Sequence, residues 1–144
     1  ACTIRRCLDY KNVNIVSIGI RNISREEASF AKKNKERVRI FWAKDKIDSQ
    51  LKEIVKQIKD NNVYISFDLD VFDSSLMAAT GTPEPGGLFW NEATEIIKAV
   101  TLNSNILGAD IAELAPIKGL HSYNFLAARL CYKIISYIFH YNRP

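Results

Sequence analysis

Three aspartates lie close together in the middle of the chain, in the stretch SFDLDVFD at residues 66–73. Asp68 and Asp70 are separated by one residue, so on an extended strand both carboxylates would project to the same side. Two carboxylates held close together repel each other, and a divalent cation relieves that repulsion. Because carboxylate oxygens suit Mg²⁺, Mn²⁺ and Ca²⁺, the spacing indicates a metal site. The alternative is a pair of solvated aspartates that only terminate a strand.

A loop rich in proline and glycine follows this acidic stretch. The Pro/Gly loop, GTPEPGG at residues 81–87, contains two prolines and three glycines. Proline restricts the backbone, whereas glycine lets the backbone approach a ligand closely. Long aperiodic loops are often functional, although the same composition also suits an ordinary surface connection.

Short apolar runs alternate with helical patterns, and these elements must position the acidic residues. Ser24 and Glu27 have the spacing of a capping box at a helix start, and Asp48 or Ser49 is expected to cap the next helix. That next helix carries one apolar face, formed by Leu51, Ile54, Val55 and Ile58. The expected strands are residues 13–20, 38–42, 63–67 and 106–111, and two later helices are expected at residues 91–100 and 122–141.

This alternation predicts an α/β fold with a mainly parallel sheet, because parallel strands need crossover connections that helices supply. In such sheets, ligands gather at the carboxyl ends of the strands, which here means just after Phe67 and just after Ile111. The last helix is expected to pack into the core through its apolar residues, which are Leu126, Leu130, Ile134, Ile135 and Ile138.

Composition excludes several classes of function. The chain has 144 residues, which is about one domain, and 47% of them are hydrophobic. Its net charge of +4 and its scattered basic residues do not predict a nucleic-acid interface, and the basic cluster at residues 32–39 is expected to be a solvated face. No apolar run is long enough to span a bilayer. Three cysteines in no metal-type spacing favour a reducing compartment, so we expect a soluble cytoplasmic protein.

Four separate motifs, in the order in which they occur in that family, resemble those of the ureohydrolases, the family of arginases and agmatinases. The acidic stretch is similar to the family's second metal motif, and the Pro/Gly loop has the form more typical of agmatinases. The other two motifs are GADIAELAP at residues 108–116 and IGIR at residues 18–21, followed by Glu26 and Glu27.

The resemblance implies a three-layer α/β/α fold around a mainly parallel sheet, incomplete in this chain. It implies a pair of Mn²⁺ ions and the hydrolysis of a guanidino compound, with agmatine favoured, to urea and an amine. By the same resemblance, Asp68 and Asp70 are metal ligands, Glu113 binds the substrate guanidinium, and Thr82 lines the pocket. Asp110 is expected to be structural, Asp73 to belong to a turn or to support the metal ligands without binding the metal, and His121 to lie at a pocket rim or helix cap.

The family's other metal ligands, an earlier histidine and an Asp-x-His-x-Asp segment, do not occur here, since the only histidines are His121 and His140. We therefore expect residues 1–144 to be the carboxy-terminal part of a single ureohydrolase domain whose amino-terminal part is missing. No catalytic residue is assigned, and the isolated chain is expected to be inactive. A complete domain is expected to form a homo-oligomer, as is common in the family.

Two alternatives remain at this stage. One is a non-catalytic half-domain that pairs with a partner chain. The other is a phosphatase of the haloacid-dehalogenase type, because FDLD at residues 67–70 also resembles the first motif of that class, although Val71 stands where glycine usually follows.

Overall fold

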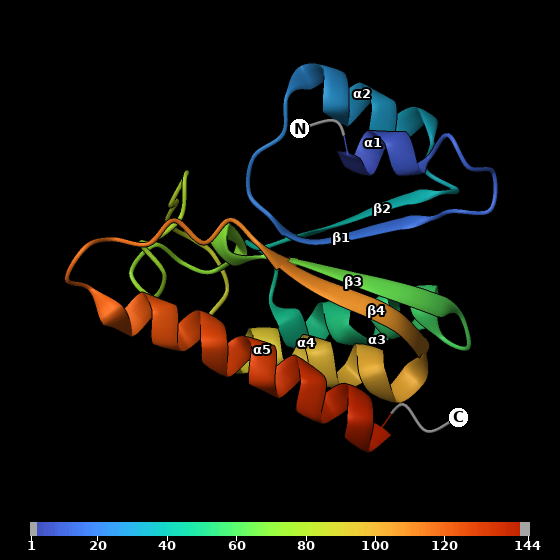
Figure 1. The fold of residues 1–144 in the computed structure, drawn as a ribbon. Helices are drawn as coiled ribbons and strands as arrows, with labels where there is room; N and C mark the ends of the chain where they lie inside the picture. Colours follow the sequence, from blue (N-terminus) through green and yellow to red (C-terminus); the bar gives the residue numbers. More distant parts are fainter. Residues whose placement is uncertain (1–2, 142–144) are drawn as a thin grey trace.

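A computed structural model describes residues 3–141, and it shows strands and helices that alternate as the sequence predicts (Figure 1). The elements are α1 (Thr3–Cys7), β1 (Ile15–Ile20), α2 (Arg25–Lys33), β2 (Val38–Trp42), α3 (Ile47–Ile58), β3 (Asn62–Asp68), the 3₁₀ turn η1 (Leu69–Val71), α4 (Trp90–Asn103), β4 (Asn105–Ala112) and α5 (His121–Tyr141). The four expected strands and the later helices are therefore confirmed, with shifts of one to two residues at most ends.

All strand pairing in the described part of the chain is parallel, which confirms the predicted α/β class. The strands form two pairs, β1 with β2 and β3 with β4. The two pairs lie close together at one end and diverge towards the other (Figure 1). Because no hydrogen-bonded ladder joins β1 to β3 in residues 3–141, other contacts must connect the two pairs.

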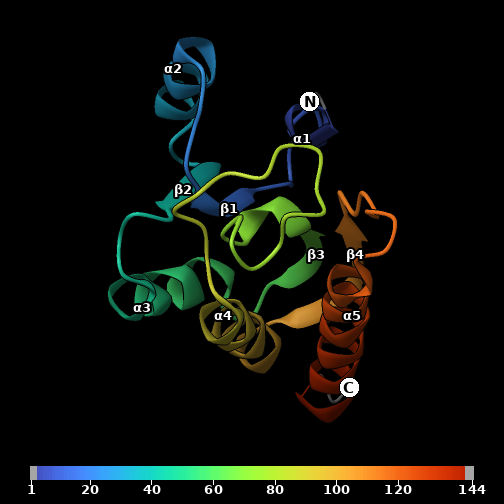
Figure 2. The ribbon, with the colours of Figure 1, turned by 90° about the vertical axis from the view of Figure 1, so that its left-hand side faces the viewer.

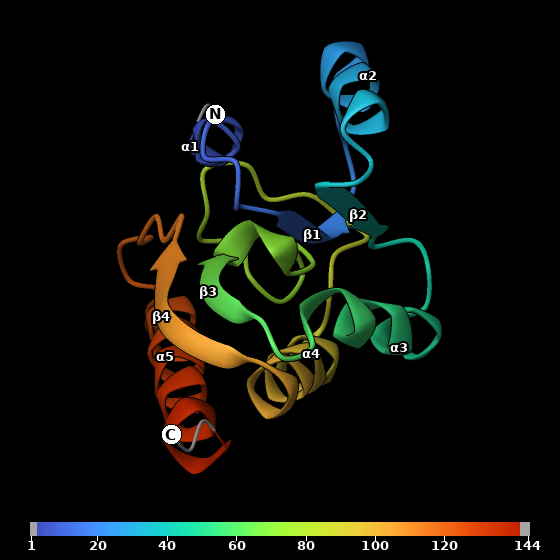
Figure 3. The same ribbon diagram turned by 90° about the vertical axis from the view of Figure 1, so that its right-hand side faces the viewer.

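Helices lie on both sides of the strand layer. α1 and α2 lie near the β1–β2 pair, whereas α3, α4 and α5 lie together on the other side (Figures 1 and 2). Figure 3 shows α5 beside β4 and α3 towards the β1–β2 pair, with α4 between these two helices. This arrangement agrees with the three layers that the resemblance implied.

The core lies between the β3–β4 pair and the helices α4 and α5. Leu69, Phe72, Met77 and Leu130 are fully buried, and they belong to one apolar cluster. The ring of Phe72 packs 5.5 Å from that of Phe67 and 6.4 Å from that of Trp90, measured between centroids. Complete burial of one such side chain contributes roughly 1.5–3 kcal/mol, so this cluster holds the end of β3 firmly in place.

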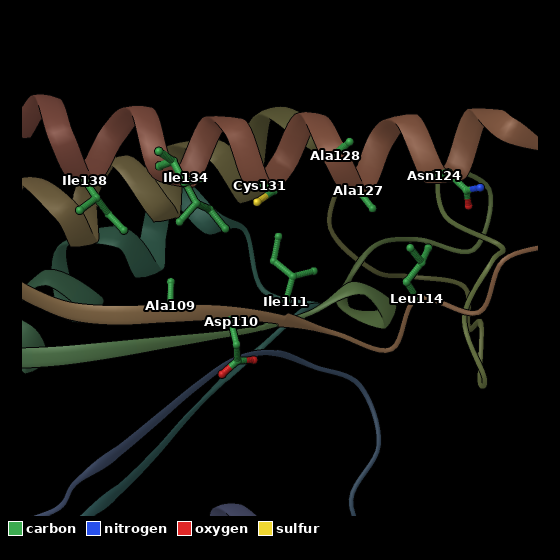
Figure 4. Close-up of a pocket in the computed structure, with 11 residues that line it drawn as sticks. Ala109, Asp110, Ile111, Leu114, Asn124, Ala127, Ala128, Cys131, Ile134 and Ile138 are labelled. Carbon is green, nitrogen blue, oxygen red and sulfur yellow. The ribbon is translucent and has the colours of Figure 1, made fainter.

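The opposite face of the β3–β4 pair is open to solvent. Tyr64 is 60% exposed, and Ser66, Asp68 and Asp110 on the same face are also exposed. In Figure 4, Asp110 points away from α5, whereas Ile111 points towards it. The alternation of side chains along a strand thus separates a packed face from a polar one.

Of the three predictions made for α2 and α3, two are confirmed. The Ser24–Glu27 capping box is confirmed, since the Glu27 amide donates to Ser24 Oγ at 3.1 Å and the Ser24 amide donates to Glu27 Oε2 at 2.7 Å. The apolar face of α3 is also confirmed, with Ile54 and Ile58 buried. The predicted cap at Asp48 or Ser49 is wrong.

α3 begins earlier than expected, at Ile47, and Lys46 is its cap without a side-chain hydrogen bond. Ile47 is only 4% exposed and packs in an apolar cluster with Leu88 and Ile96. Burial of this side chain therefore outweighs the local preference for a polar cap. Ser49, now inside the first turn, donates from Oγ to the carbonyl of Lys46 at 2.6 Å.

The core prediction for α5 is confirmed for Leu130 and Ile134, which are buried, and for Leu126 and Ile138, which pack against the core cluster. It is wrong for Ile135, which is 47% exposed and lines a groove beside β4. Among the described helices, none has the length and apolar character needed to cross a membrane.

Candidate active site

The acidic turn, residues 68–71, is built differently from the sequence prediction. β3 ends at Asp68, and the chain then enters η1, so Asp70 lies on a turn and not on an extended strand. The Asp70 amide donates to Asp68 Oδ1 at 3.2 Å, which closes the turn. The two carboxyls still lie close enough to interact, so their predicted proximity holds although the expected strand geometry is wrong.

The protonation of Asp68 reflects this crowding. Asp68 is exposed as a residue, but the surrounding protein shields its carboxyl, and this partial burial raises the pKa of Asp68 to about 6. The negative charges of Asp70 and Glu113 raise the pKa further, whereas the hydrogen bond from the Asp70 amide opposes the shift. A site with this excess of negative charge favours a bound cation.

The Pro/Gly loop reaches the acidic turn through Thr82, whose Oγ1 donates to Asp70 Oδ2 at 3.2 Å. Asp73 holds the base of this loop, because its Oδ2 accepts from the Gly86 amide at 2.6 Å and its Oδ1 accepts from the Ser75 amide at 2.9 Å. The hydrogen bonds from Ser75 and from the Gly86 amide lower the pKa of Asp73 to about 2. Asp73 is therefore the turn residue that the sequence predicted.

Glycine is required where the loop returns to the core. A Cβ added at Gly87 would lie 2.5 Å from the backbone nitrogen of Asp73 and 2.5 Å from the carbonyl carbon of Phe72. Backbone atoms cannot move aside as the end of a side chain can, so position 87 admits no larger residue without displacing the loop.

Glu113 lies just beyond the end of β4, where its backbone has the left-handed φ of 66°. Its charge acts on the Asp68 carboxyl, and its Oε2 would lie 3.7 Å from a Cβ added at Gly81, so it borders both the acidic turn and the Pro/Gly loop. The Ala115 amide donates to the carbonyl of Ala79 at 2.8 Å and ties these two segments together. The structure thus brings Asp68, Asp70, Thr82 and Glu113 to the carboxyl ends of β3 and β4, as predicted.

Asp110 is the structural residue that the sequence predicted. It is paired in register with Ser66, whose Oγ donates to Asp110 Oδ1 at 3.0 Å. A side-chain hydrogen bond with Asp110 also raises the pKa of Tyr64. These three side chains form a polar network on the open face of the β3–β4 pair, next to Asp68 along β3.

In the described part of the chain, neither histidine forms a metal-binding group with Asp68, Asp70 and Glu113. His121 begins α5 and is exposed, as expected for a rim or cap residue, and the ring of His140 packs edge-on to that of Tyr141 at 4.5 Å. Within residues 3–141, no group of three or more histidine, cysteine or acidic side chains is arranged to hold a metal ion. Asp68 and Asp70 have the right donor chemistry for a divalent cation, but the described residues supply only part of a coordination sphere.

Two arginines have roles that the sequence analysis missed. Arg21 follows β1 and donates from Nη1 to the carbonyl of Val71 at 3.0 Å and from Nη2 to the carbonyl of Asp70. Arg37, which we had placed in a solvated basic cluster, is half-buried and donates to the carbonyls of Leu8, Tyr10 and Val13. Local sequence patterns could not reveal these contacts, because the partners lie 24 to 50 residues away.

The family model described as the arginase family matches residues 1–136. The chain belongs to this family. The resemblance seen in the sequence is therefore confirmed, and the match favours the ureohydrolase interpretation over the phosphatase alternative.

The chain is similar to arginase-family relatives both in sequence and in structure. The chain is 34% identical over 139 residues to the N(1)-aminopropylagmatine ureohydrolase of Synechocystis, covering 95% of this chain and 44% of that protein. It is 38% identical over 104 residues to the agmatinase of Halalkalibacterium halodurans, covering 72% of this chain and 35% of that protein.

Among solved structures, the chain resembles a putative agmatinase from Clostridium difficile, with a TM-score of 0.80 and 34% identity, covering 94% of this chain and 49% of that one. A proclavaminate amidino hydrolase from Streptomyces clavuligerus gives a TM-score of 0.82 at 25% identity, covering 97% of this chain and 48% of that one. The chain thus spans less than half the length of these relatives.

Proposed function

We propose that this arginase-family chain contributes to the hydrolysis of a guanidino compound to urea and an amine, with Mn²⁺ as the metal. The observation that carries the proposal is the convergence of Asp68, Asp70, Thr82 and Glu113 at the carboxyl ends of β3 and β4. A guanidinium carbon is a poor electrophile, so the reaction needs both a strong nucleophile and a substrate held firmly in place.

Asp68 and Asp70 are the residues that would hold Mn²⁺, since their carboxylate oxygens suit this ion and their mutual repulsion favours a cation between them. Two bound ions, when present, would lower the pKa of water and so supply a nucleophile near neutral pH. The side chain of Thr82 holds the Asp70 carboxylate through its hydrogen bond, which limits the directions in which Asp70 can point.

Glu113 is the residue proposed to bind the substrate guanidinium through charge-assisted hydrogen bonds. It is exposed at the end of β4, so its carboxylate is accessible to a ligand above the acidic turn. The names of the relatives, agmatinase and N(1)-aminopropylagmatine ureohydrolase, support a substrate of the agmatine type.

We also propose that catalysis requires a further part of an arginase-family domain, and that the complete domain forms a homo-oligomer. The described residues supply an incomplete set of metal ligands, and the relatives are about twice as long as this chain. A groove of about 630 Å³ between β4 and α5 provides a surface where further elements of such a domain would pack (Figure 4). Its lining is mostly apolar, and Asn124 Oδ1 lies buried there without a hydrogen-bond partner in the described structure.

The decisive experiment is a chimera. The part of the Clostridium difficile protein that this chain does not match would be placed before residue 1, and Mn²⁺ binding and urea release would be measured. We expect Mn²⁺-dependent urea release from the chimera and none from the chain alone. Asp68→Asn with Asp70→Asn should weaken Mn²⁺ binding by at least about tenfold, since even outer-shell substitutions cost 10–100-fold.

Asp45→Asn is the matched control, because it makes the same chemical change at an exposed position after β2. It should leave binding and turnover as they are. Urea release that survives the double substitution would refute the assignment of the metal ligands. A chimera that folds well but takes up no Mn²⁺ would instead support a non-catalytic half-domain.

A further inference from the structure

The two strand pairs meet at the side chain of Arg21. This side chain is only 13% exposed, and its two terminal nitrogens donate to the consecutive carbonyls of Asp70 and Val71. Both acceptors belong to the backbone of the acidic turn. Arg21 therefore connects the end of β1 to the segment that carries the two proposed metal ligands.

The same guanidinium also faces the Pro/Gly loop. Its Nε lies 3.8 Å from Glu84 Oε2, and the neighbouring Asn22 donates from Nδ2 to that same oxygen at 2.7 Å. Glu84 is two residues after Thr82, whose hydroxyl binds the Asp70 carboxylate. Residues at the end of β1 thus contact both the acidic turn and the Pro/Gly loop. The relative position of these two segments sets the direction of the Asp70 side chain.

Close packing of the Gly19 backbone against the side chain of Val71 supports this junction. Gly19, near the end of β1, has a left-handed φ of 79°, and a Cβ added there would clash with Val71 Cγ2. The Leu88 amide in turn donates to the carbonyl of Val71 at 2.9 Å, which is the same carbonyl that Arg21 binds. Val71 is therefore held by two hydrogen bonds to its carbonyl and by packing of its side chain against Gly19.

We propose that Arg21 is a positioning residue for the acidic turn, holding the Asp70 and Val71 carbonyls so that the Asp68 and Asp70 carboxylates and Thr82 keep their relative directions. It acts through the backbone and contacts neither metal nor substrate. The proposed function explains only why a fixed turn would be useful, and the contacts themselves do not depend on it. A planar guanidinium has donors in a rigid fork, so a lysine cannot bind both carbonyls in the same way.

Amide hydrogen exchange of the whole chain tests this proposal without requiring activity. Arg21→Lys should accelerate exchange at the Asp70 and Leu88 amides by about tenfold, the effect of losing one to two net hydrogen bonds. Exchange at Leu130 and Ile134, in the buried part of α5, should stay within about twofold of the unsubstituted chain.

Arg37→Lys is the matched control, because Arg37 also binds backbone carbonyls but at the opposite end of β1 and β2. It should accelerate exchange near Ile15, whose amide donates to the Arg37 carbonyl at 2.7 Å, and leave Asp70 and Leu88 unchanged. Should Arg21→Lys fail to fold, Glu84→Gln removes the charge beside Nε and should accelerate the same two amides by about twofold to threefold.

Two results would overturn the proposal: unchanged exchange at Asp70 and Leu88 in Arg21→Lys, or equal acceleration throughout the chain including Leu130. In the chimera, Arg21→Lys should also raise the Mn²⁺ dissociation constant by about tenfold, whereas Arg37→Lys should not. A chimera that binds no Mn²⁺ would contradict the proposed function, but the exchange pattern would still decide the role of Arg21.

Discussion

The two strand pairs are alike in sequence pattern and different in packing. β3 and β4 face two helices across a core in which Leu69, Phe72 and Leu130 are fully buried. The strands of both pairs are mostly half-buried or exposed, and Ile18 of β1 packs against a second apolar cluster. The covering helices differ, because α4 and α5 supply buried side chains, whereas neither α1 nor α2 contains a buried residue. The two halves should therefore differ in stability.

The largest expected effect is a cavity in the β3–β4 half. Leu130→Ala should reduce the free energy of unfolding by about 2–5 kcal/mol, because the buried side chain leaves a space that its neighbours fill only in part. Ile18→Ala, at a half-buried position of β1, should reduce the free energy of unfolding clearly less. Urea unfolding of both variants measures the difference, with Leu102→Ala, 52% exposed on α4, as a control expected to stay within about 0.5 kcal/mol. Equal losses for Leu130→Ala and Ile18→Ala would remove the contrast between the halves.

The junction between the two halves is tested by a pair of glycines with matching backbones. Gly19 has φ 79° and Gly119 has φ 83°, so alanine at either position carries the left-handed strain of about 1–2 kcal/mol. Only in Gly19→Ala should the new methyl group also clash with the side chain of Val71, which adds about 1–3 kcal/mol to the loss of stability. Thermal unfolding measures both losses of stability. Equal losses for Gly119→Ala and Gly19→Ala would mean that β1 does not pack against the acidic turn.

The cap of α2 should matter locally, because this helix has no buried residue to anchor it. Ser24→Ala should destabilise α2 by about 1 kcal/mol through loss of the capping box, seen as faster amide exchange within residues 25–33. Ser29→Ala, on an exposed position of the same helix, should slow exchange slightly or leave it unchanged, since alanine favours helix. Faster exchange in both variants would show that the cap is not the cause.

The smallest expected effect concerns pH. The pKa of Asp73 lies at about 2 in the folded chain, below its ordinary value of 3.8, so its hydrogen bonds to Ser75 and Gly86 stabilise the fold fully above pH 4. That contribution should fade as the pH drops from about 4 to about 2, because the carboxylate then takes up a proton. Asp73→Asn should show a weaker loss of stability over this interval. An identical pH dependence in both chains would contradict the assignment.

Much of the candidate site could be predicted because its residues lie at strand ends. Asp68 and Glu113 follow apolar runs, and parallel strands place such ends at one edge. The Pro/Gly loop was identified by its proline and glycine content and Thr82 by resemblance, and the structure brings Thr82 to Asp70. The cap of α3 was mispredicted because burial of Ile47 outweighs the preference of a nearby polar residue.

Local periodicity, proline and glycine content and the spacing of carboxylates are properties of neighbouring residues, so the sequence by itself determined the parallel α/β class, the Ser24 cap and the acidic strand end. Tertiary structure alone decided that Asp70 lies on a turn, that Ile135 borders a groove, and that Arg21 reaches carbonyls 49 and 50 residues away. Contacts of that separation depend on how the strand pairs converge, and no pattern of adjacent residues contains this information.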